Sequence, residues 1–145
     1  MGLDMYLDKH VYIGANWEHR NATGGLDITM GDLHIQIPAK EISSVICPGA
    51  YWRKANQIHR WFVENVQDGT DDCGTYYVSW EQIQELKYLC LRALAKKNPE
   101  ILPPQGGFFF GSTDIDKWYW NDLQATVDQL EKLDEGASYY YHSSW

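Results

Sequence analysis

The stretch Leu26–Ile37 reads LDITMGDLHIQI, and its apolar residues alternate with polar ones on both sides of the dipeptide Gly31-Asp32. Alternation with a period of two is typical of strands that bury one face, and a Gly-Asp dipeptide between two such runs is typical of a tight turn. His34 belongs to the polar set, so we expect it to face solvent rather than a functional site. The stretch therefore predicts an antiparallel hairpin.

The rest of the chain predicts strands and helices in an irregular order. Besides the hairpin, we expect one or two strands within residues 3–13, a loop over 14–25, and further strands over 41–47, 74–78, within 106–113 (short and buried) and over 139–141. Three helices are expected. The first runs over residues 51–66, the second follows a capping box at Ser79 and Gln82, and the third runs over 116–134. Pro48-Gly49 is expected to break the chain before the first helix, and Ser112 or Thr113 to cap the third. Because strands and helices do not alternate strictly, we expect one α+β domain over residues 1–145, with a mainly antiparallel sheet of about five or six strands and three helices.

Composition limits the kinds of partner. The chain has a net charge of −8 with scattered acidic residues, whereas general nucleic-acid binding needs a clustered basic face. Its apolar runs are shorter than the ~20 residues that cross a bilayer, so we expect no membrane partner. Three cysteines without a C-x-x-C pair, and no secretion signal, indicate a reduced, cytoplasmic protein. The seven Trp and ten Tyr suit pocket walls and interfaces as well as a core.

The predicted helix over residues 51–66 carries the first part of a candidate site. Its segment Tyr51–Phe62 reads YWRKANQIHRWF, with cations, an amide and a histidine among large aromatic residues. Arginine binds phosphate or carboxylate through two parallel hydrogen bonds, lysine adds a mobile charge, and tryptophan can stack on a flat ligand. The alternative is a solvated helix face with a hydrogen-bonded core histidine. The ligand-binding candidates on this helix are Trp52, Arg53, Lys54, Asn56 and His59.

Two further segments complete the candidate site. Gly106–Thr113 reads GGFFFGST, where a strand that passes into a helix can offer backbone N–H groups to a phosphate. The glycine spacing matches neither the Walker nor the dinucleotide pattern, so turn glycines beside a helix cap are the alternative. A terminal tryptophan indicates that the chain end packs back onto the body, beside the candidate pocket. These segments add Gly111, Ser112, Thr113 and Trp145 to the ligand-binding candidates.

Other reactive residues give weaker signals. The loop Gln67–Cys73 holds three carboxylates and a thiol, but it lacks the distal glutamate of a calcium loop, and the adjacent carboxylates disfavour a thiolate. The pair His142-Ser143 lacks a third group that would complete a triad. Cys90 lies on the apolar stripe of the second helix and is expected in the core. We therefore expect neither a metal nor a cofactor, and we assign no catalytic residue.

Five blocks occur in order along the chain: GLDMYL from Gly2, YWRKANQIH from Tyr51, QDG with DDC from Gln67, GFFFGST from Gly107, and a terminal SSW. With these blocks the chain resembles a family of small, largely uncharacterised phage and bacterial proteins, and residues 16–40 match least. The resemblance implies a phage-like origin and a bacterial host cell. It carries no established catalytic residue.

These features favour a phage-like protein that binds, and can sequester, a small anionic ligand derived from a nucleotide, as a counter-defence sponge does; this hypothesis rests on analogy. One alternative is a small enzyme that acts on a nucleotide-like substrate through His59 or His142 with Cys73, Asp71 or Asp72. Another is an inhibitor whose exposed aromatic residues dock on a host or defence protein. Formation of a homo-oligomer stays open.

Overall fold

The computed structural model describes residues 2–14 and 17–145, so Ala15 and Asn16, in the loop predicted over residues 14–25, lie outside the described residues. Contacts divide the chain into two compact units, here called unit 1 (Met1–Lys9 and Pro48–Trp145) and unit 2 (His10–Cys47). Each is described by itself. That the two units form the single domain expected for residues 1–145 stays a prediction.

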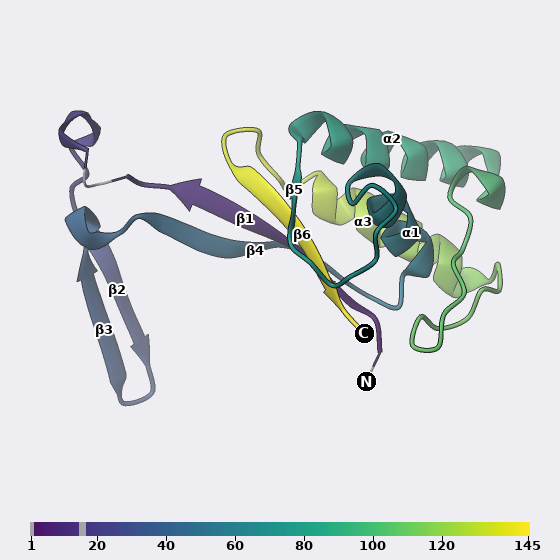
Figure 1. The fold of residues 1–145 in the computed structure, drawn as a ribbon, viewed down its shortest axis with the longest axis horizontal. Coiled ribbons are helices and arrows are strands. Elements are labelled where there is room, and N and C mark those ends of the chain that lie inside the picture. The colour runs from purple at the N-terminus through teal and green to yellow at the C-terminus, as the bar shows by residue number, and fades with distance from the viewer. Residues whose placement is uncertain (1, 15–16) are drawn as a thin grey trace. The chain divides into compact units, whose positions relative to one another are not determined.

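A four-stranded sheet in the order β4-β1-β6-β5 and three α-helices form most of the described chain (Figure 1). The strands of this sheet are β1 (Asp4–Tyr12), β4 (Ser44–Arg53), β5 (Tyr76–Val78) and β6 (Ser138–Ser144), and the helices are α1 (Asn56–Asn65), α2 (Trp80–Lys96) and α3 (Lys117–Leu130). A second sheet pairs β2 (Gly25–Met30) with β3 (Leu33–Pro38), and 3-10 turns lie at Glu18–Arg20, Ala39–Glu41 and Pro99–Ile101. The described residues thus contain three helices and six strands in two antiparallel sheets, which confirms the predicted α+β class.

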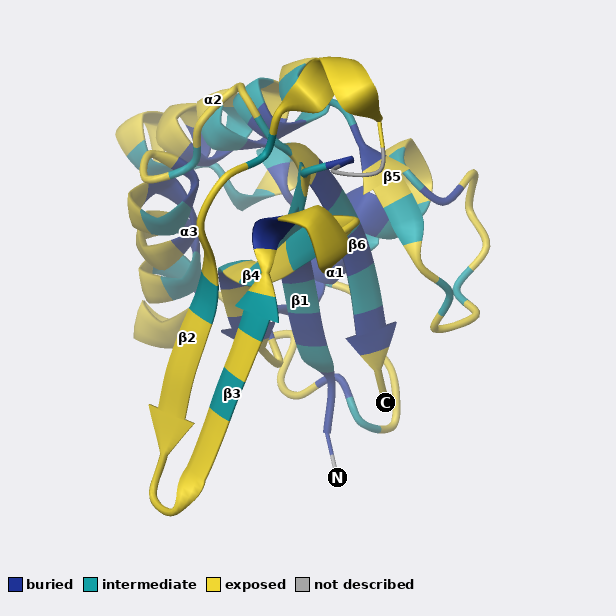
Figure 2. Cartoon of the chain, turned by 90° about the vertical axis from the view of Figure 1, so that its left-hand side faces the viewer, coloured by how far each residue is buried: buried dark blue, intermediate teal, exposed yellow. Residues whose placement is uncertain are grey.

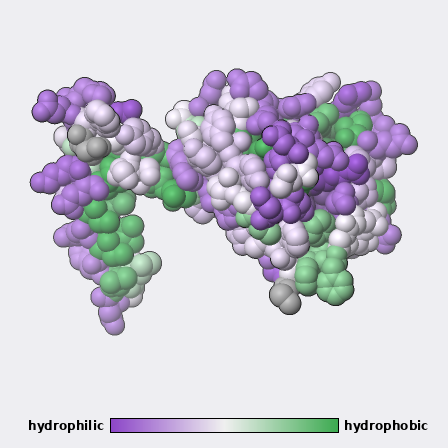
Figure 3. All heavy atoms as spheres, viewed as in Figure 1, coloured by the Kyte–Doolittle hydropathy of each residue, from purple (hydrophilic) through white to green (hydrophobic). Residues whose placement is uncertain are grey.

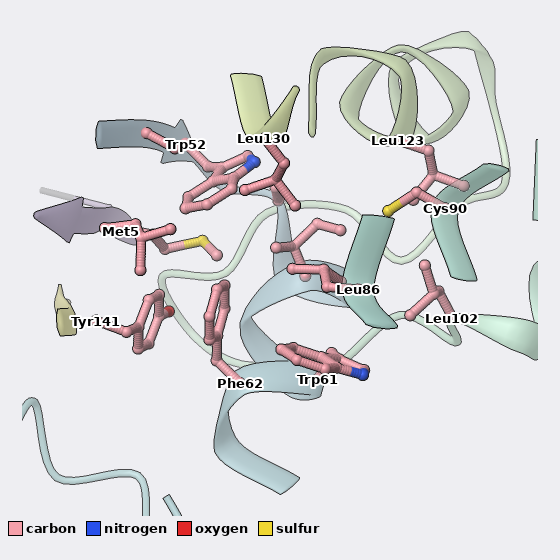
Figure 4. Close-up of a cluster of buried hydrophobic side chains, with 14 of the residues drawn as sticks. Met5, Trp52, Trp61, Phe62, Leu86, Cys90, Leu102, Leu123, Leu130 and Tyr141 are labelled. Atoms are coloured by element: carbon pink, nitrogen blue, oxygen red, sulfur yellow. The ribbon is translucent and has the colours of Figure 1, made fainter. Parts of the chain in front are cut away.

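The core of unit 1 forms where alternate residues of β1 and β6 meet side chains of all three helices. Figure 2 shows this alternation as dark blue bands along β1 and β6. The Tyr141 ring of β6 stacks on Phe62 of α1, with ring centroids 3.9 Å apart (Figure 4). A sheet with one face buried against helices explains the period-two pattern at both ends of the chain.

Helix α2 follows its sequence signals. The predicted capping box is present: Ser79 Oγ accepts from the Gln82 backbone N–H, and the Gln82 side chain accepts from the Ser79 N–H. Cys90 is buried as predicted, and burial raises the pKa of its thiol to about 12. No helix in the described part of the chain is long and apolar enough to cross a membrane.

The helix predicted over residues 51–66 begins later, at Asn56, because β4 continues to Arg53. The predicted break at Pro48-Gly49 is also wrong. β4 is an edge strand, where proline is tolerated, and glycine lets β1 approach, since a Cβ added at Gly49 would lie 2.6 Å from the Leu7 carbonyl oxygen. On a strand, neighbouring residues point to opposite faces, so Trp52 is buried while Arg53 is exposed.

Residues 106–113 form a turn and a loop, not the buried strand that the sequence predicts. Phe110 packs inward, whereas Phe108 is 95% exposed. Glycine is needed inside the turn, because a Cβ added at Gly107 would lie 2.7 Å from the Phe110 ring. The run of phenylalanines therefore reflects a folded-back loop rather than strand pairing.

The cap of α3 also differs from the prediction. The Asp116 carboxylate accepts hydrogen bonds from backbone N–H groups of the first turn, so neither Ser112 nor Thr113 is the cap. An aspartate at this position satisfies the free N–H groups and also suits the positive end of the helix dipole. The backbone donors expected to face a phosphate are thus already occupied by Asp116.

Unit 2 contains the predicted hairpin. β2 and β3 pair antiparallel around Gly31-Asp32, which confirms the prediction, and exposed His34 lies 2.6 Å from the Asp27 carboxylate. Three cross-strand pairs put six aliphatic side chains on one face of the hairpin, visible as a line of apolar spheres in Figure 3: Leu26 with Ile37, Ile28 with Ile35, and Met30 with Leu33.

Candidate functional site

A cavity of about 280 Å³ in unit 1 lies between the end of β4, the start of α1, the loop before α3 and the first turns of α3. Of the nine predicted ligand-binding residues, five line this cavity. They are Arg53, Lys54, Asn56, Gly111 and Ser112. The fold therefore brings together most of the two segments that carried the sequence-based site, although the first is helical only from Asn56 and the second forms a turn and a loop.

Lys54 is held in an unusual conformation at the cavity wall. Its φ of 59° is left-handed, a region that costs a non-glycine residue roughly 1–3 kcal/mol. Two glycines leave room for its side chain, because a Cβ added at Gly111 would lie 3.2 Å from Lys54 Cβ and one added at Gly2 would lie 3.1 Å from Lys54 Cε. The aliphatic stem thus lies against two backbone segments. Its ammonium group forms no ion pair within the described residues.

Arg53 lies beside Lys54 with only a loose partner. Its guanidinium nitrogen is 3.8 Å from the Asp4 carboxylate, and its side chain is mostly exposed. The Tyr51 hydroxyl donates a hydrogen bond to the same carboxylate, and this bond is the main reason that the pKa of Tyr51 is raised. Exposed pairs of this kind contribute about 0–1 kcal/mol, so Arg53 can exchange its partner for a ligand at little cost.

Asn56 orders the cavity wall instead of facing a ligand. It is 1% exposed, and its Nδ2 donates to the carbonyl oxygens of Phe110 at 3.0 Å and Ser112 at 2.9 Å. Its Oδ1 accepts from the Gln105 backbone N–H at 3.0 Å. Because these three bonds use both amide hydrogens and the oxygen, Asn56 fixes the loop before α3 against the start of α1.

Carboxylates and an aromatic ring form the opposite wall. Asp114, Asp116 and Asp122 line the cavity there, together with Trp118, which is 64% exposed. Burial raises the pKa of Asp122, while the hydrogen bond from Gln57 acts in the opposite direction. Within the described residues none of these carboxylates pairs with Arg53 or Lys54. Charges of both signs therefore face one cavity without neutralising each other.

His59 lies outside this cavity. The ligand hypothesis needs Arg53, Lys54 and His59 around one pocket, and the structure groups only the first two. His59 is fully buried, with Nδ1 2.7 Å from the Tyr141 hydroxyl and Nε2 2.9 Å from Asp71 Oδ2. Both ring nitrogens have hydrogen-bond partners within the fold, so His59 is the hydrogen-bonded core histidine that stands as the alternative to a ligand-binding role.

A chain of hydrogen bonds runs from Tyr141 through His59 and Asp71 to the last residue. A carboxylate can only accept, so we assign the proton to Nε2 and let Nδ1 accept from the tyrosine hydroxyl. The Trp145 indole N–H donates to Asp71 Oδ1 at 3.1 Å. Burial, followed by the Asp71 charge, raises the pKa of Tyr141 well above its ordinary value. The chain ties β6 and the carboxyl terminus to α1 and the loop after it.

The remaining predicted site residues lie elsewhere. Trp52 is in the core, where its indole N–H donates to Thr126 Oγ1 at 2.8 Å (Figure 4). Thr113 is exposed and does not line the cavity. Trp145 does pack back onto the body, as predicted, but beside Asp71 and Phe110 rather than at this cavity.

Of the residues proposed for chemistry, His59 and Asp71 are hydrogen-bonded to each other, whereas His142 pairs with Asp8. His142 lies 2.9 Å from Asp8 and stacks on Tyr6, and it alternates with Tyr141 along β6, so the two point to opposite faces of the sheet. Cys73 is exposed and forms no hydrogen bond with a histidine among the residues that the structure describes. Within those same residues no group of three His, Cys, Asp or Glu side chains is placed to hold a metal ion.

The sequence-based site missed the second wall of the cavity. Gln57, Asp114, Trp118, Tyr119 and Asp122 all line it. A usable signal was the spacing of four residues between Trp118 and Asp122, which places both on one side of the first turns of α3, whereas Asp114 lies in the loop before the helix.

Comparison with protein-family models, with curated proteins and with solved structures found no match. The resemblance to a phage and bacterial family therefore stays a prediction. Function must therefore be inferred from the geometry and charge of the sites themselves.

Proposed function

We propose that the protein binds a small anionic, nucleotide-like ligand in the cavity between α1 and α3 and sequesters it without turnover. The observation that carries the proposal is Lys54, which lines the cavity beside Arg53, has a strained backbone and a glycine-flanked stem, and forms no ion pair within the described residues. Strain of this kind persists when the surrounding structure enforces it, and it concentrates at functional sites.

The two walls of the cavity suit two different parts of a ligand. Arg53 and Lys54 suit a phosphate, since arginine binds it with two bonds and lysine adds a point charge. The carboxylates of Asp114 and Asp122 accept hydrogen bonds, which suits ribose hydroxyls or the amino group of a base, and Trp118 offers an exposed ring for stacking. A ligand with a phosphate alone would leave the acidic wall unmatched.

The cavity size favours a ligand no larger than one nucleotide. Its volume of about 280 Å³ lies at the lower end of ligand pockets, which span roughly 300–1,000 Å³. Sequestration suits the site better than catalysis, because neither His59 nor His142, the two histidines considered as acid–base groups, lines the cavity. A general acid or base must reach the proton that it transfers. A phage-like origin would make such a protein a counter-defence sponge.

Isothermal titration calorimetry at low salt tests the proposal with three probes: adenosine monophosphate, adenosine and inorganic phosphate. We expect the monophosphate to bind at least ~10-fold more tightly than either part alone, because a charge-assisted hydrogen bond contributes about 1.5–3 kcal/mol. Mass spectrometry of the recovered ligand is expected to show it intact.

A matched pair of variants locates the site. Lys54→Gln keeps an unbranched polar side chain, one atom shorter than that of lysine, but removes the charge, and we expect ~10-fold weaker binding of the monophosphate. Lys96→Gln removes an exposed lysine at the end of α2 and is the control. Equal binding by the two variants, or equal binding of nucleoside and nucleotide, would refute the proposed site.

A further inference from the structure

A second depression in unit 1 is formed by two adjoining hollows of about 440 Å³ and 370 Å³. Asp71 and Phe110 belong to both hollows, so the two meet at these side chains. The smaller hollow is bounded by Phe108, Phe109 and Trp145, and Gly106 and Gly107 contribute no side chains to fill it. Figure 3 shows an apolar patch at the lower edge of unit 1, where the loop before α3 turns.

The rings of the smaller hollow stand at right angles to one another. Phe108 and Phe109 are inclined by 87°, with centroids 4.8 Å apart, and Phe110 and Trp145 by 73°, with centroids 5.8 Å apart. A flat ring is best held between two parallel rings, and neither of these pairs is parallel. Perpendicular rings present several faces to one compact group, which is the arrangement of an aromatic cage.

One carboxylate, that of Asp71, lines this hollow beside the rings and is held in place. Asp71 accepts from His59 through Oδ2 and from Trp145 through Oδ1, yet its side chain remains 26% exposed. Each carboxylate oxygen has a second lone pair, so Asp71 can still face a ligand. His59 is itself fixed by Tyr141, and this chain keeps the carboxylate oriented.

We infer that this cage, formed by Phe108, Phe109, Phe110, Trp145 and Asp71, binds an alkylated ammonium group. Ring faces attract a cation within about 6 Å of their centroids, and the carboxylate supplies the matching charge. The nearest cation at the depression, Arg60, lies in the larger hollow and is paired with Glu64 at 2.7 Å. The inference is independent of the anionic site between α1 and α3.

The charge of the surroundings supports a cationic ligand. Asp68 and Asp72 lie in the same loop as Asp71, and the chain as a whole carries a net charge of −8. An anionic ligand would meet three carboxylates of one loop, whereas an ammonium group gains from each of them within the screening length of about 8–10 Å. The ammonium group can belong to a free small molecule or to a methylated lysine of a peptide.

The test compares choline with 3,3-dimethylbutan-1-ol, which has the same shape without the charge. Both are titrated into the whole protein while two-dimensional NMR follows the tryptophan indole N–H signals, including Trp145. We expect choline to bind at least ~10-fold more tightly and to shift the Trp145 signal. Equal affinities, or no shift of that signal at saturating choline, would overturn the inference.

Two variants separate the cage from general packing. Phe108→Ala removes a ring that is 95% exposed, so the fold should be unaffected, and choline affinity is expected to fall about 2–5-fold. Tyr88→Ala removes an exposed ring of α2 and is the control. Asp71→Asn keeps the shape of the side chain and should reduce the preference for choline over the uncharged probe, because the rings remain but the carboxylate charge is lost. Unchanged choline affinity in Phe108→Ala, or an unchanged preference in Asp71→Asn, contradicts the cage.

A further titration, with peptides, identifies the source of the ligand. A peptide that carries trimethyllysine is compared with choline and with the unmethylated peptide. Binding of the methylated peptide at least ~10-fold more tightly than choline supports a protein source, and equal binding supports a free small molecule. Tighter binding of the unmethylated peptide than of the methylated one would overturn the inference, because a cage favours the alkylated group.

Discussion

Replacing Asn56 by alanine should loosen the loop that separates the cavity from the aromatic cage. The side chain makes three hydrogen bonds, to the Phe110 and Ser112 carbonyl oxygens and from the Gln105 N–H. At about 1 kcal/mol for each bond, the loss is about 3 kcal/mol, and an unpaired buried carbonyl adds to it. Water can reach the Ser112 carbonyl, which is only partly buried, so we expect a total of about 2–4 kcal/mol.

The expected loss is large enough for a simple measurement. For 145 residues the entropy of unfolding is about 0.3 kcal/mol per degree, so 3 kcal/mol lowers Tm by about 10 °C. Urea unfolding followed by circular dichroism gives the free energy directly. Asn121→Ala, an exposed change within α3, is the control and should stay within about 0.5 kcal/mol of the parent. A loss below about 1 kcal/mol for Asn56→Ala would refute the role of this side chain in ordering the loop.

Three further outcomes follow from the structure. Gly111→Ala should lower the free energy of unfolding more than Gly69→Ala does, because both positions have positive φ but, of the two, only Gly111 has a side chain within 4 Å of an added Cβ. Chemical unfolding of the two variants measures the difference, and equal losses would exclude crowding at the cavity wall. Cys73 should react with a thiol reagent at pH 8, whereas Cys90 should react only on unfolding, because burial raises the pKa of the Cys90 thiol to about 12. Mass spectrometry of the labelled peptides measures this, and labelling of Cys90 in the folded protein would contradict it. The pKa of Tyr141 is raised in the folded state, so the stability that this residue contributes is complete below the unfolded pKa near 10 and is lost as the pH rises above it. The free energy of unfolding, measured by chemical unfolding, should therefore fall above pH 10, and it should fall less steeply in Tyr141→Phe. The same pH dependence in both proteins would contradict this.

Local signals predicted the elements that depend on neighbouring residues. The hairpin of Leu26–Ile37 has its turn and register within the segment, since alternation and a Gly-Asp dipeptide specify both. The start of α2 is equally local, because Ser79 and Gln82 cap each other across one turn. Such elements can be predicted because the groups that satisfy their hydrogen bonds lie within a few residues in the chain.

The strand-to-helix passage at Tyr51–Ala55 could not be predicted in this way. Tyr51, Ala55 and Ile58 fit a helical stripe, while the buried Trp52 next to the exposed Arg53 fits a strand. Pairing of β4 with β1 decides between the two patterns, and it depends on a partner more than forty residues away. Long-range pairing overrides local preference at this point.

The candidate site could likewise be predicted only in part from the sequence. Composition and residue type indicated a segment rich in cations and aromatic rings and a glycine-rich loop, and five of those residues do line one cavity. The sequence did not separate Lys54, which faces the cavity, from His59, which the core absorbs with Tyr141 and Asp71. Lys54 lies in the turn between β4 and α1, whereas the packing of α1 directs His59 into the core.

The sequence by itself determined the α+β class, the hairpin, the capped second helix and the type of chemistry to look for, because these follow from short-range periodicity and residue type. Tertiary structure alone decided that Asp114, Trp118 and Asp122 form the second wall of the cavity and that Asp71 lines one hollow with Phe110 and Trp145. These groups come from separate segments, and their meeting depends on how helices, loops and the final strand pack into one core.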